Sequence, residues 1–234
     1  MARRARAGAQ PGRVCGVKPP PKNSRPALRS GSAFRENVES LAWAIGLMLL
    51  VRIFLIQAFR IPSESMRDTL LVGDFLFVTK LDYGAKLPFT HIRLPGLRAP
   101  RRGDIIVFQW PPDPSQDFIK RCIATGGQTV EVRHKQVSVD GKPLVEPYAR
   151  HTQAGEEPEG LSPRDNFAPH LVPAGHLFMM GDNRENSADS RYWGYVPMDL
   201  VKGRALFIYF STASQHWWDM PFYVRWERLF RILH

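Results

Sequence analysis

A long apolar run dominates the hydrophobic pattern in the N-terminal quarter of the chain. Residues 41–51 contain no polar side chain, Arg52 interrupts the run, and residues 53–59 continue it with a single Gln. As a helix with a rise of about 1.5 Å per residue, residues 41–59 would extend roughly 28 Å, close to the roughly 30 Å hydrocarbon core of a bilayer. The pattern therefore predicts one transmembrane helix over residues 38–59, with Arg52 reaching toward the interface.

The residues that flank this run predict its orientation. Residues 1–35 contain seven Arg, two Lys and no acidic residue. A basic flank favours the cytoplasmic side, so we expect a single-pass inner-membrane protein with a cytoplasmic N-terminus and residues 60–234 outside the cytoplasm. A cleaved secretory signal is the alternative. It is disfavoured because the basic segment is much longer than a signal's charged region and because Phe59-Arg60-Ile61-Pro62, rather than a small-x-small site, follows the run.

Beyond residue 60 the pattern changes to short segments rich in β-branched and aromatic residues. Strands are predicted over 74–79, 105–110, 118–124, 128–133, 136–139, 176–180 and 205–210, with a turn at Asp140-Gly141. Residues 150–175 are polar and rich in Pro and Gly, which predicts a loop. No helical period of useful length occurs here. The fold class expected is therefore mainly β, as an antiparallel β domain that follows a single N-terminal helix.

The net charge of +10 changes this picture little. The basic tail supplies nine of those charges, so the rest of the chain is nearly neutral. The charge therefore does not indicate a nucleic-acid-binding domain, and no nucleic-acid partner is expected. Residues 1–37, which include Pro19-Pro20-Pro21, are poor in core-forming side chains and are predicted to be a disordered cytoplasmic tail.

The chain offers little for metal or disulfide chemistry. Its two cysteines, Cys15 and Cys122, lie on opposite sides of the apolar run and cannot pair across a membrane. Cys122 lies in an apolar strand-like segment and is expected to be a buried structural thiol. No Cys/His spacing typical of zinc occurs, so neither a metal nor another cofactor is predicted.

Three motifs carry the candidate chemistry. The first is Pro62-Ser-Glu-Ser-Met-Arg-Asp-Thr-Leu70, followed by Gly73-Asp74. The second is the segment Phe118-Ile-Lys-Arg121, and the third is Gly181-Asp-Asn-Arg-Glu-Asn-Ser-Ala-Asp-Ser-Arg-Tyr-Trp-Gly194. Together, directly after an apolar run, they resemble the type I signal peptidases, which are membrane-anchored Ser/Lys proteases. The resemblance covers residues 59–193 and the anchor before them.

The resemblance assigns a role to each catalytic position. Ser65 matches the nucleophile and Lys120 the general base, which must be neutral to accept a proton. Its pKa must therefore be lowered by burial from about 10.4. Ser63 matches the hydroxyl that forms the oxyanion hole together with the backbone N–H of Ser65, and Ser187 matches the serine that orients the lysine amine. Asp189 and Arg191 are expected to form a supporting ion pair, whereas Asp182-Asn183 is expected to form turn hydrogen bonds.

The resemblance also implies a fold, a substrate and partners. A small β subdomain, here at about residues 129–174, is expected as an insertion in the catalytic β domain. Exported preproteins are the expected substrates, cleaved after Ala-x-Ala-type sequences, with membrane lipid and the secretion translocon nearby. Shallow pockets that exclude large side chains are expected from apolar residues flanking the site: Phe59, Ile61, Pro62, Leu70, Phe118 and Ile119.

Two departures from the family pattern lie beside the nucleophile. Glu64 occupies the place of a small residue and Asp68 that of a proline. If the Glu64 carboxylate faced Lys120 it would raise the pKa of that lysine, so we expect it to point to solvent. Because the catalytic side chains are all present, an active enzyme is predicted.

Alternative interpretations remain at this stage. A histidine base is disfavoured because no histidine lies in a recognisable triad motif. A specialised peptidase with a single substrate, of the pilin or conjugation type, would have the same residues. An inactive membrane-tethered binding relative would have no need of them. The aromatic and Arg-rich stretch 217–234 suits either contact with lipid headgroups or a short helix packed on the β domain.

Overall fold

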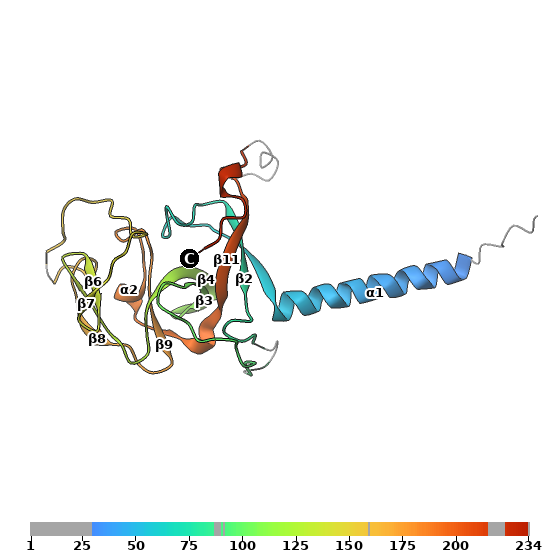
Figure 1. The fold of residues 1–234 in the computed structure, drawn as a ribbon, viewed down its shortest axis with the longest axis horizontal. Helices are drawn as coiled ribbons and strands as arrows, with labels where there is room; N and C mark the ends of the chain where they lie inside the picture. Colours follow the sequence, from blue (N-terminus) through green and yellow to red (C-terminus); the bar gives the residue numbers. More distant parts are fainter. Residues whose placement is uncertain (1–29, 87–89, 91, 159, 215–222, 234) are drawn as a thin grey trace, which may run out of the picture. The chain divides into compact units, whose positions relative to one another are not determined.

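The structure is a computed structural model that describes residues 30–86, 90, 92–158, 160–214 and 223–233 (Figure 1). The basic residues 1–29, Cys15 among them, and residues 217–222 of the aromatic stretch lie outside the described residues. Residues Ala44–His234 form one compact unit, and residues Met1–Trp43 are a second unit. The compact unit contains all three sequence motifs, so the candidate site is built within it.

The N-terminal helix differs from the predicted one at both ends. Helix α1 spans Ser30–Phe54 and therefore includes residues 30–37 of the predicted disordered tail. Extending an existing helix costs little per residue, which accounts for the earlier start. At the other end, residues Ile56–Arg60 form strand β1 instead of completing the helix. They pair with β2, and Gln57 and Phe59 are half-buried in alternation with exposed neighbours.

The predicted membrane helix over 38–59 is thus divided between a helix and a strand. Within the described part of the chain, no helix is long and apolar enough to span a bilayer.

The main sheet has seven strands and is antiparallel throughout, as predicted. Its order is β1-β2-β11-β3-β4-β9-β10. The remaining bounds are β2 Asp74–Thr79, β3 Ile105–Trp110, β4 Asp113–Thr125, β9 His176–Met180, β10 Val196–Pro197 and β11 Val201–Ser211. β4 and β11 are each longer than the predicted strands 118–124 and 205–210. The central position of β4, between β3 and β9, buries the segment that carries Lys120.

A second sheet occupies the stretch where an inserted subdomain was expected. It has the order β7-β6-β5-β8, with bounds β5 Thr129–Arg133, β6 Gln136–Val139, β7 Lys142–Pro143 and β8 Phe167–Leu171. β8 corrects the prediction of an unbroken loop over 150–175. Its five residues are mostly exposed and lack apolar alternation, so only their pairing with β5 makes them a strand.

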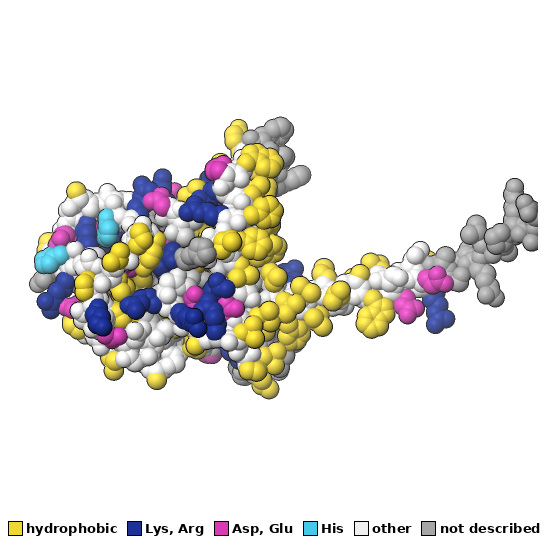
Figure 2. Space-filling model, in the orientation of Figure 1, with side chains coloured by type: hydrophobic (Ala, Val, Ile, Leu, Met, Phe, Trp, Pro, Cys, Tyr) yellow, Lys and Arg dark blue, Asp and Glu magenta, His cyan; other side chains and the backbone are white. Residues whose placement is uncertain are grey.

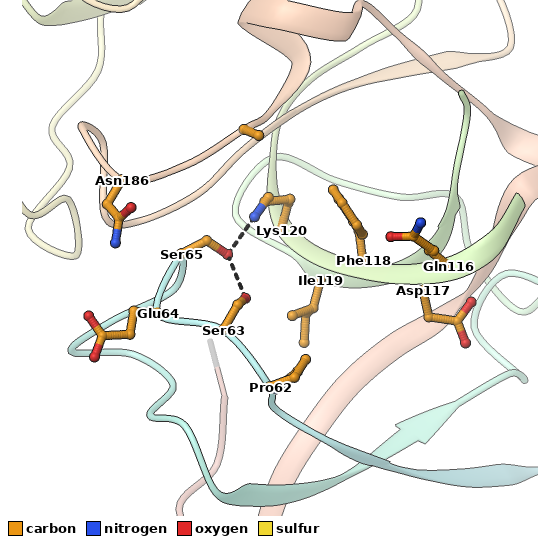
Figure 3. Close-up of a pocket in the computed structure, with 11 residues that line it drawn as sticks. Pro62, Ser63, Glu64, Ser65, Gln116, Asp117, Phe118, Ile119, Lys120 and Asn186 are labelled. Atoms are coloured by element: carbon orange, nitrogen blue, oxygen red, sulfur yellow. Dashed lines mark hydrogen bonds between the residues drawn. The ribbon is translucent and has the colours of Figure 1, made fainter. Parts of the chain in front are cut away.

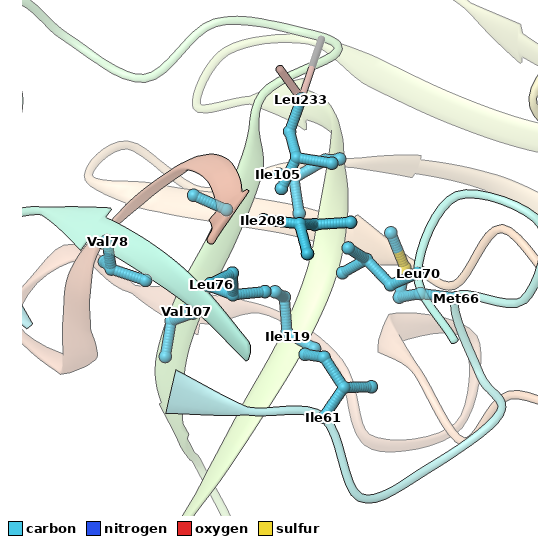
Figure 4. Close-up of a cluster of buried hydrophobic side chains, with 11 residues drawn as sticks. Ile61, Met66, Leu70, Leu76, Val78, Ile105, Val107, Ile119, Ile208 and Leu233 are labelled. Atoms are coloured by element: carbon cyan, nitrogen blue, oxygen red, sulfur yellow. The ribbon is translucent and has the colours of Figure 1, made fainter. Parts of the chain in front are cut away.

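Buried apolar side chains join the nucleophile motif to the main sheet (Figure 4). Met66 and Leu70 are fully buried and pack with Ile61, Ile119 and Ile208 in one cluster. At roughly 1.5–3 kcal/mol for each fully buried large side chain, this packing contributes strongly to holding the segment between β1 and β2 in place. Ser65 lies between β1 and the buried Met66 and Leu70, and it is thereby held against the sheet.

The C-terminal residues pack on the same sheet. A 3-10 turn spans Trp226–Arg228, and Phe207 of β11 forms an isolated bridge with Ile232. The buried Arg228 guanidinium donates to Asp74 Oδ2 at 2.6 Å. Residues 223–233 therefore pack against the β domain, while Trp226 and Phe230 stay exposed.

Candidate active site

Ser65 and Lys120 are in direct contact although 55 positions separate them in the sequence (Figure 3). Lys120 Nζ lies 2.5 Å from Ser65 Oγ and donates a hydrogen bond to it. When the amine is neutral, the same contact can run in the other direction, with the serine hydroxyl donating. A nucleophile within hydrogen-bonding reach of a base is the geometry that proton abstraction requires.

Burial tunes the amine toward the neutral form. Lys120 is 4% exposed, on the inner part of β4, and it has no ion-pair partner among the described residues. Burial lowers the pKa of Lys120 to about 8, while Asp189 raises it and Arg191 lowers it by smaller amounts. About a tenth of the amine is therefore neutral at pH 7, and this fraction, which can take the proton from serine, grows as the pH rises.

The backbone of the nucleophile segment is fixed by the third motif. Asn183 N–H donates to the carbonyl of Ser65 at 3.0 Å, and Asn183 Nδ2 donates to the carbonyl of Glu64 at 3.1 Å. Gly181 also lies close to Ser65, because a Cβ at position 181 would come within 2.5 Å of the Ser65 carbonyl oxygen and 2.2 Å of Ser187 Oγ. Only glycine fits there. Residues 181–183 therefore act as a brace for Ser65.

Asp182 has a larger role than the turn predicted from sequence. Its carboxylate accepts from Arg121 Nε at 2.9 Å and Nη2 at 2.8 Å, and from Thr69 Oγ1 at 2.6 Å. Arg121 also stacks over the Tyr148 ring, 3.9 Å from its centroid. The Arg121–Asp182 ion pair links β4, the strand that carries Lys120, with Thr69 in the segment that follows the nucleophile. Sequence reasoning missed it because its members lie 61 positions apart.

Asp189 and Arg191 form an ion pair with a shortest distance of 2.8 Å, and both side chains are buried. Asp189 Oδ2 also accepts from the Gly181 N–H at 3.0 Å. Burial alone would raise the pKa of Asp189, but Arg191 and these hydrogen bonds outweigh it, so the pKa is lowered. The ionised carboxylate thus supports the glycine on which the nucleophile segment rests.

The two other predicted serines lie beside the dyad. Ser63 Oγ is 3.4 Å from Ser65 Oγ, so a carbonyl attacked by Ser65 would lie within reach of the Ser63 hydroxyl. Ser187 is buried against Gly181, and its hydroxyl helps to lower the pKa of Asp189. Among the described residues, this hydroxyl forms no hydrogen bond of normal geometry. Its predicted role in orienting Lys120 stays a prediction.

A cleft of about 360 Å³ opens over the Ser65–Lys120 pair (Figure 3). Of the residues predicted to form pockets, Pro62, Phe118 and Ile119 line it. Ile61 and Leu70 are instead buried in the core beneath the site, and Phe59 packs against that core. These three therefore shape the cleft through the packing of its floor. Gln116, Asp117, Asn186 and Ala188 line the cleft as well and were not anticipated.

Glu64 and Asp68, the departures from the family pattern beside the nucleophile, both pair with arginines. The Glu64 carboxylate lies 3.1 Å from the Arg67 guanidinium, with half of each side chain exposed. Asp68 has a φ of 76°, which proline cannot adopt, so the turn differs here from the family pattern. Its carboxylate accepts from Arg150 Nη1 at 2.6 and 2.8 Å, which joins this turn to the chain that leaves the second sheet.

Other chemistry finds no support at this site. The described histidines with ring hydrogen bonds contact groups elsewhere, such as His134 with Glu156 and His151 with Glu185. Across the described residues, no cluster of His, Cys, Asp or Glu could hold a metal ion. Cys122 is buried and free, as expected, and burial raises the pKa of its thiol to about 12.

Comparison with known proteins places this chain in a family. Residues 34–210 match the family described as signal peptidase, peptidase S26. Signal peptidase I of Pseudomonas aeruginosa is 35% identical over 213 residues, covering 76% of this chain and 73% of that protein. Signal peptidase I of Aquifex aeolicus is also 35% identical, over 228 residues and 84% of that protein. Probable signal peptidase I-1 of Synechocystis is 42% identical over 186 residues, covering 76% and 84%. The chain belongs to the peptidase S26 family of signal peptidases and is a serine protease of that type.

Proposed function

We propose that the protein removes N-terminal signal peptides from exported preproteins, with Ser65 as nucleophile and neutral Lys120 as general base. The contact of 2.5 Å between Lys120 Nζ and Ser65 Oγ carries this proposal, because it joins a nucleophile to a base whose pKa is lowered to about 8. The same contact disfavours an inactive binding relative, which would have no need of a buried amine. Membership of the S26 family supplies the substrate class.

The reaction takes place in two steps. Lys120 accepts the Ser65 proton as Oγ attacks the carbonyl carbon of the scissile bond. The oxyanion accepts hydrogen bonds from the Ser65 N–H and the Ser63 hydroxyl; each such donor is worth roughly 2.7–4 kcal/mol in the transition state. As the C–N bond breaks, Lys120 returns the proton to the leaving amine and an acyl-enzyme remains. Lys120 then takes a proton from water, whose oxygen attacks the ester carbonyl. As the ester C–O bond breaks, Lys120 gives that proton to Ser65 Oγ, and the acyl fragment leaves with a new carboxyl group.

The cleft supports selectivity for small side chains before the cleaved bond. Pro62 and Ile119 line it and lie next to each other, beside the dyad (Figure 3). Fully packed residues lie beneath, including Ile61 and Leu70, so the floor cannot deepen to admit a large side chain. Steric exclusion of this kind suits Ala-x-Ala-type sequences.

We place this activity at a membrane surface. Apolar side chains gather on the surface along β2 and β11 (Figure 2). Phe77 stacks on Tyr209 there with centroids 4.3 Å apart, and nearby Phe230 and Trp226 are each 72% exposed. Exposed aromatic side chains are enriched at membrane interfaces. An N-terminus in the cytoplasm, a catalytic unit outside it and proximity to the translocon complete the proposal.

The test uses full-length protein in detergent with a purified preprotein, and mass spectrometry to locate the cleavage site. Ser65→Ala and Lys120→Ala should each abolish cleavage while leaving a folded protein. Lys120→Arg should fail as well, because a guanidinium does not release its proton at this pH. Circular dichroism of each variant provides the control for folding. Turnover like that of the wild type in any of the three would remove the mechanism.

A further inference from the structure

The catalytic cleft carries carboxylates from both of its facing segments. Asp117 and Glu64 both line it. Asp117 Oδ2 lies 2.7 Å from Lys202 Nζ on β11, so a cation at contact distance offsets its charge. Glu64 is paired with Arg67 at 3.1 Å, but the two residues are half exposed and share a neighbouring cavity with Arg225. Glu64 is the cleft carboxylate adjacent to Ser65 in the sequence, and its side chain extends toward Arg67 and away from Lys120.

The position of Glu64 shows which part of a substrate passes it. In Figure 3, Ser65 and Lys120 lie between two ends of the cleft. Pro62, Ile119 and Phe118 lie toward one end, and Glu64 and Asn186 toward the other. Small side chains before the cleaved bond need the apolar end. An extended chain crossing the dyad, at about 3.3 Å per residue, then carries its next residues past Glu64.

The backbone of Glu64 is held in place, so its side chain has a fixed origin. Its carbonyl accepts a hydrogen bond from Asn183 Nδ2 at 3.1 Å, and its neighbours in the sequence are Ser63 and Ser65. The backbone of Glu64 is thus fixed beside the point where the scissile bond must lie, and its half-exposed carboxylate extends from there toward Arg67. A small residue at this position, as in the family pattern, would present no charge.

We propose that Glu64 is a specificity-determining residue that favours basic, and disfavours acidic, side chains in the first two positions after the cleaved bond. This inference rests on the proposed signal-peptide cleavage and deepens it. It concerns the mature end of the preprotein, whereas the apolar end of the cleft selects the residues before the bond.

The expected effect is moderate because the site is partly exposed and Arg67 offsets part of the charge. A charge interaction across a few ångströms near a protein surface corresponds to roughly a three- to tenfold preference in kcat/KM. The Debye screening length falls to about 3 Å in 1 M salt, so the preference for basic residues should largely disappear at that salt concentration.

The experiment compares three peptides that share an Ala-x-Ala cleavage site and differ only in the two residues after it, which are both Lys, both Gln or both Asp. The measured quantity is the ratio of kcat/KM for the Lys and Asp peptides, with full-length protein in detergent at low and at high salt. The variants are Glu64→Gln, Arg67→Gln and, as a matched control, Glu156→Gln. Glu156 pairs with the exposed His134 at 2.9 Å, away from the cleft.

The wild type should prefer the Lys peptide by three- to tenfold, Arg67→Gln should enlarge that ratio, and Glu64→Gln should bring it to one or below. The Glu156→Gln ratio should match that of the wild type. A ratio near one in the wild type, or one that persists in Glu64→Gln, overturns the role of Glu64. Failure of the wild type to cleave even the Gln peptide overturns the proposed function itself and this inference with it.

Discussion

The Arg121 guanidinium lies 2.8 Å from the Asp182 carboxylate, and neither side chain is more than 3% exposed. Arg121 follows Lys120 directly on β4, and successive side chains of a strand point to opposite faces. The arginine is thereby turned toward Asp182 and Thr69 while the lysine faces the nucleophile. Strand β4 thus supplies both the base and the arginine of the ion pair that holds the nucleophile segment against this strand.

Breaking this ion pair from one side should destabilise the fold strongly. Arg121→Met leaves the Asp182 carboxylate buried without its guanidinium, a change that typically costs about 3–5 kcal/mol. Chemical denaturation measures the loss. Arg67→Met is the matched control: it removes an equivalent guanidinium from the half-exposed pair with Glu64, which should cost less than about 1 kcal/mol. Equal losses for the two variants would contradict the role assigned to Arg121.

The double variant Arg121→Met/Asp182→Leu provides a second check on the same pair. Replacing both buried charges with apolar side chains removes the uncompensated carboxylate, so we expect it to be more stable than Arg121→Met alone. Thr69 would lose its acceptor at the same time, so cleavage should stay impaired even where stability recovers.

Activity should increase with pH through the pKa of Lys120. Only the neutral amine accepts the serine proton, and burial lowers that pKa to about 8. The rate constant kcat/KM should therefore fall about tenfold for each pH unit below roughly 7 and level off above roughly 9. A pH–rate profile with a peptide substrate measures this.

Glu64→Gly is an internal control for the pH profile. Because the Glu64 carboxylate contacts Arg67 and points away from Lys120, this variant should leave the midpoint of the rising limb almost unchanged. A clear shift of the midpoint to lower pH would show that the carboxylate reaches the lysine.

Removing the buried amine should stabilise the protein at neutral pH. Because the folded-state pKa of about 8 lies below the unfolded value of 10.5, the unfolded chain binds more protons between these values and stability increases with pH there. The free-energy cost of burying the protonated Lys120 amine is complete below about pH 8 and absent above about pH 10.5. Lys120→Met should therefore raise the free energy of unfolding at pH 7 by about 1–3 kcal/mol. The gain should shrink toward pH 10.5, and a gain independent of pH would point to packing instead.

The topology proposal predicts the location of the C-terminus. A reporter that is active only outside the cytoplasm should work when fused after His234 and fail when fused near Arg29. The protein should also fractionate with the membrane. The opposite pattern of reporter activity would contradict the assignment of the catalytic unit to the outer side.

The sequence predicted the antiparallel β class and most of the strands, and its resemblance to the signal peptidases predicted the roles of Ser65 and Lys120. Period-two patterns of apolar residues are local, so most strands could be recognised from neighbouring residues. The burial of Cys122 followed from its apolar neighbours for the same reason.

Only the tertiary structure decided the elements whose stability depends on distant partners. Residues 56–60 are apolar enough to continue α1, yet pairing with β2 makes them a strand. β8 lacks a strand pattern and forms because β5 offers an unpaired edge. Asp182 pairs with Arg121 across 61 positions, and Asn183 reaches Glu64 across 119. Hydrogen bonds and ion pairs between segments so far apart leave no periodic trace in the sequence, because only the folded chain brings their donors and acceptors together.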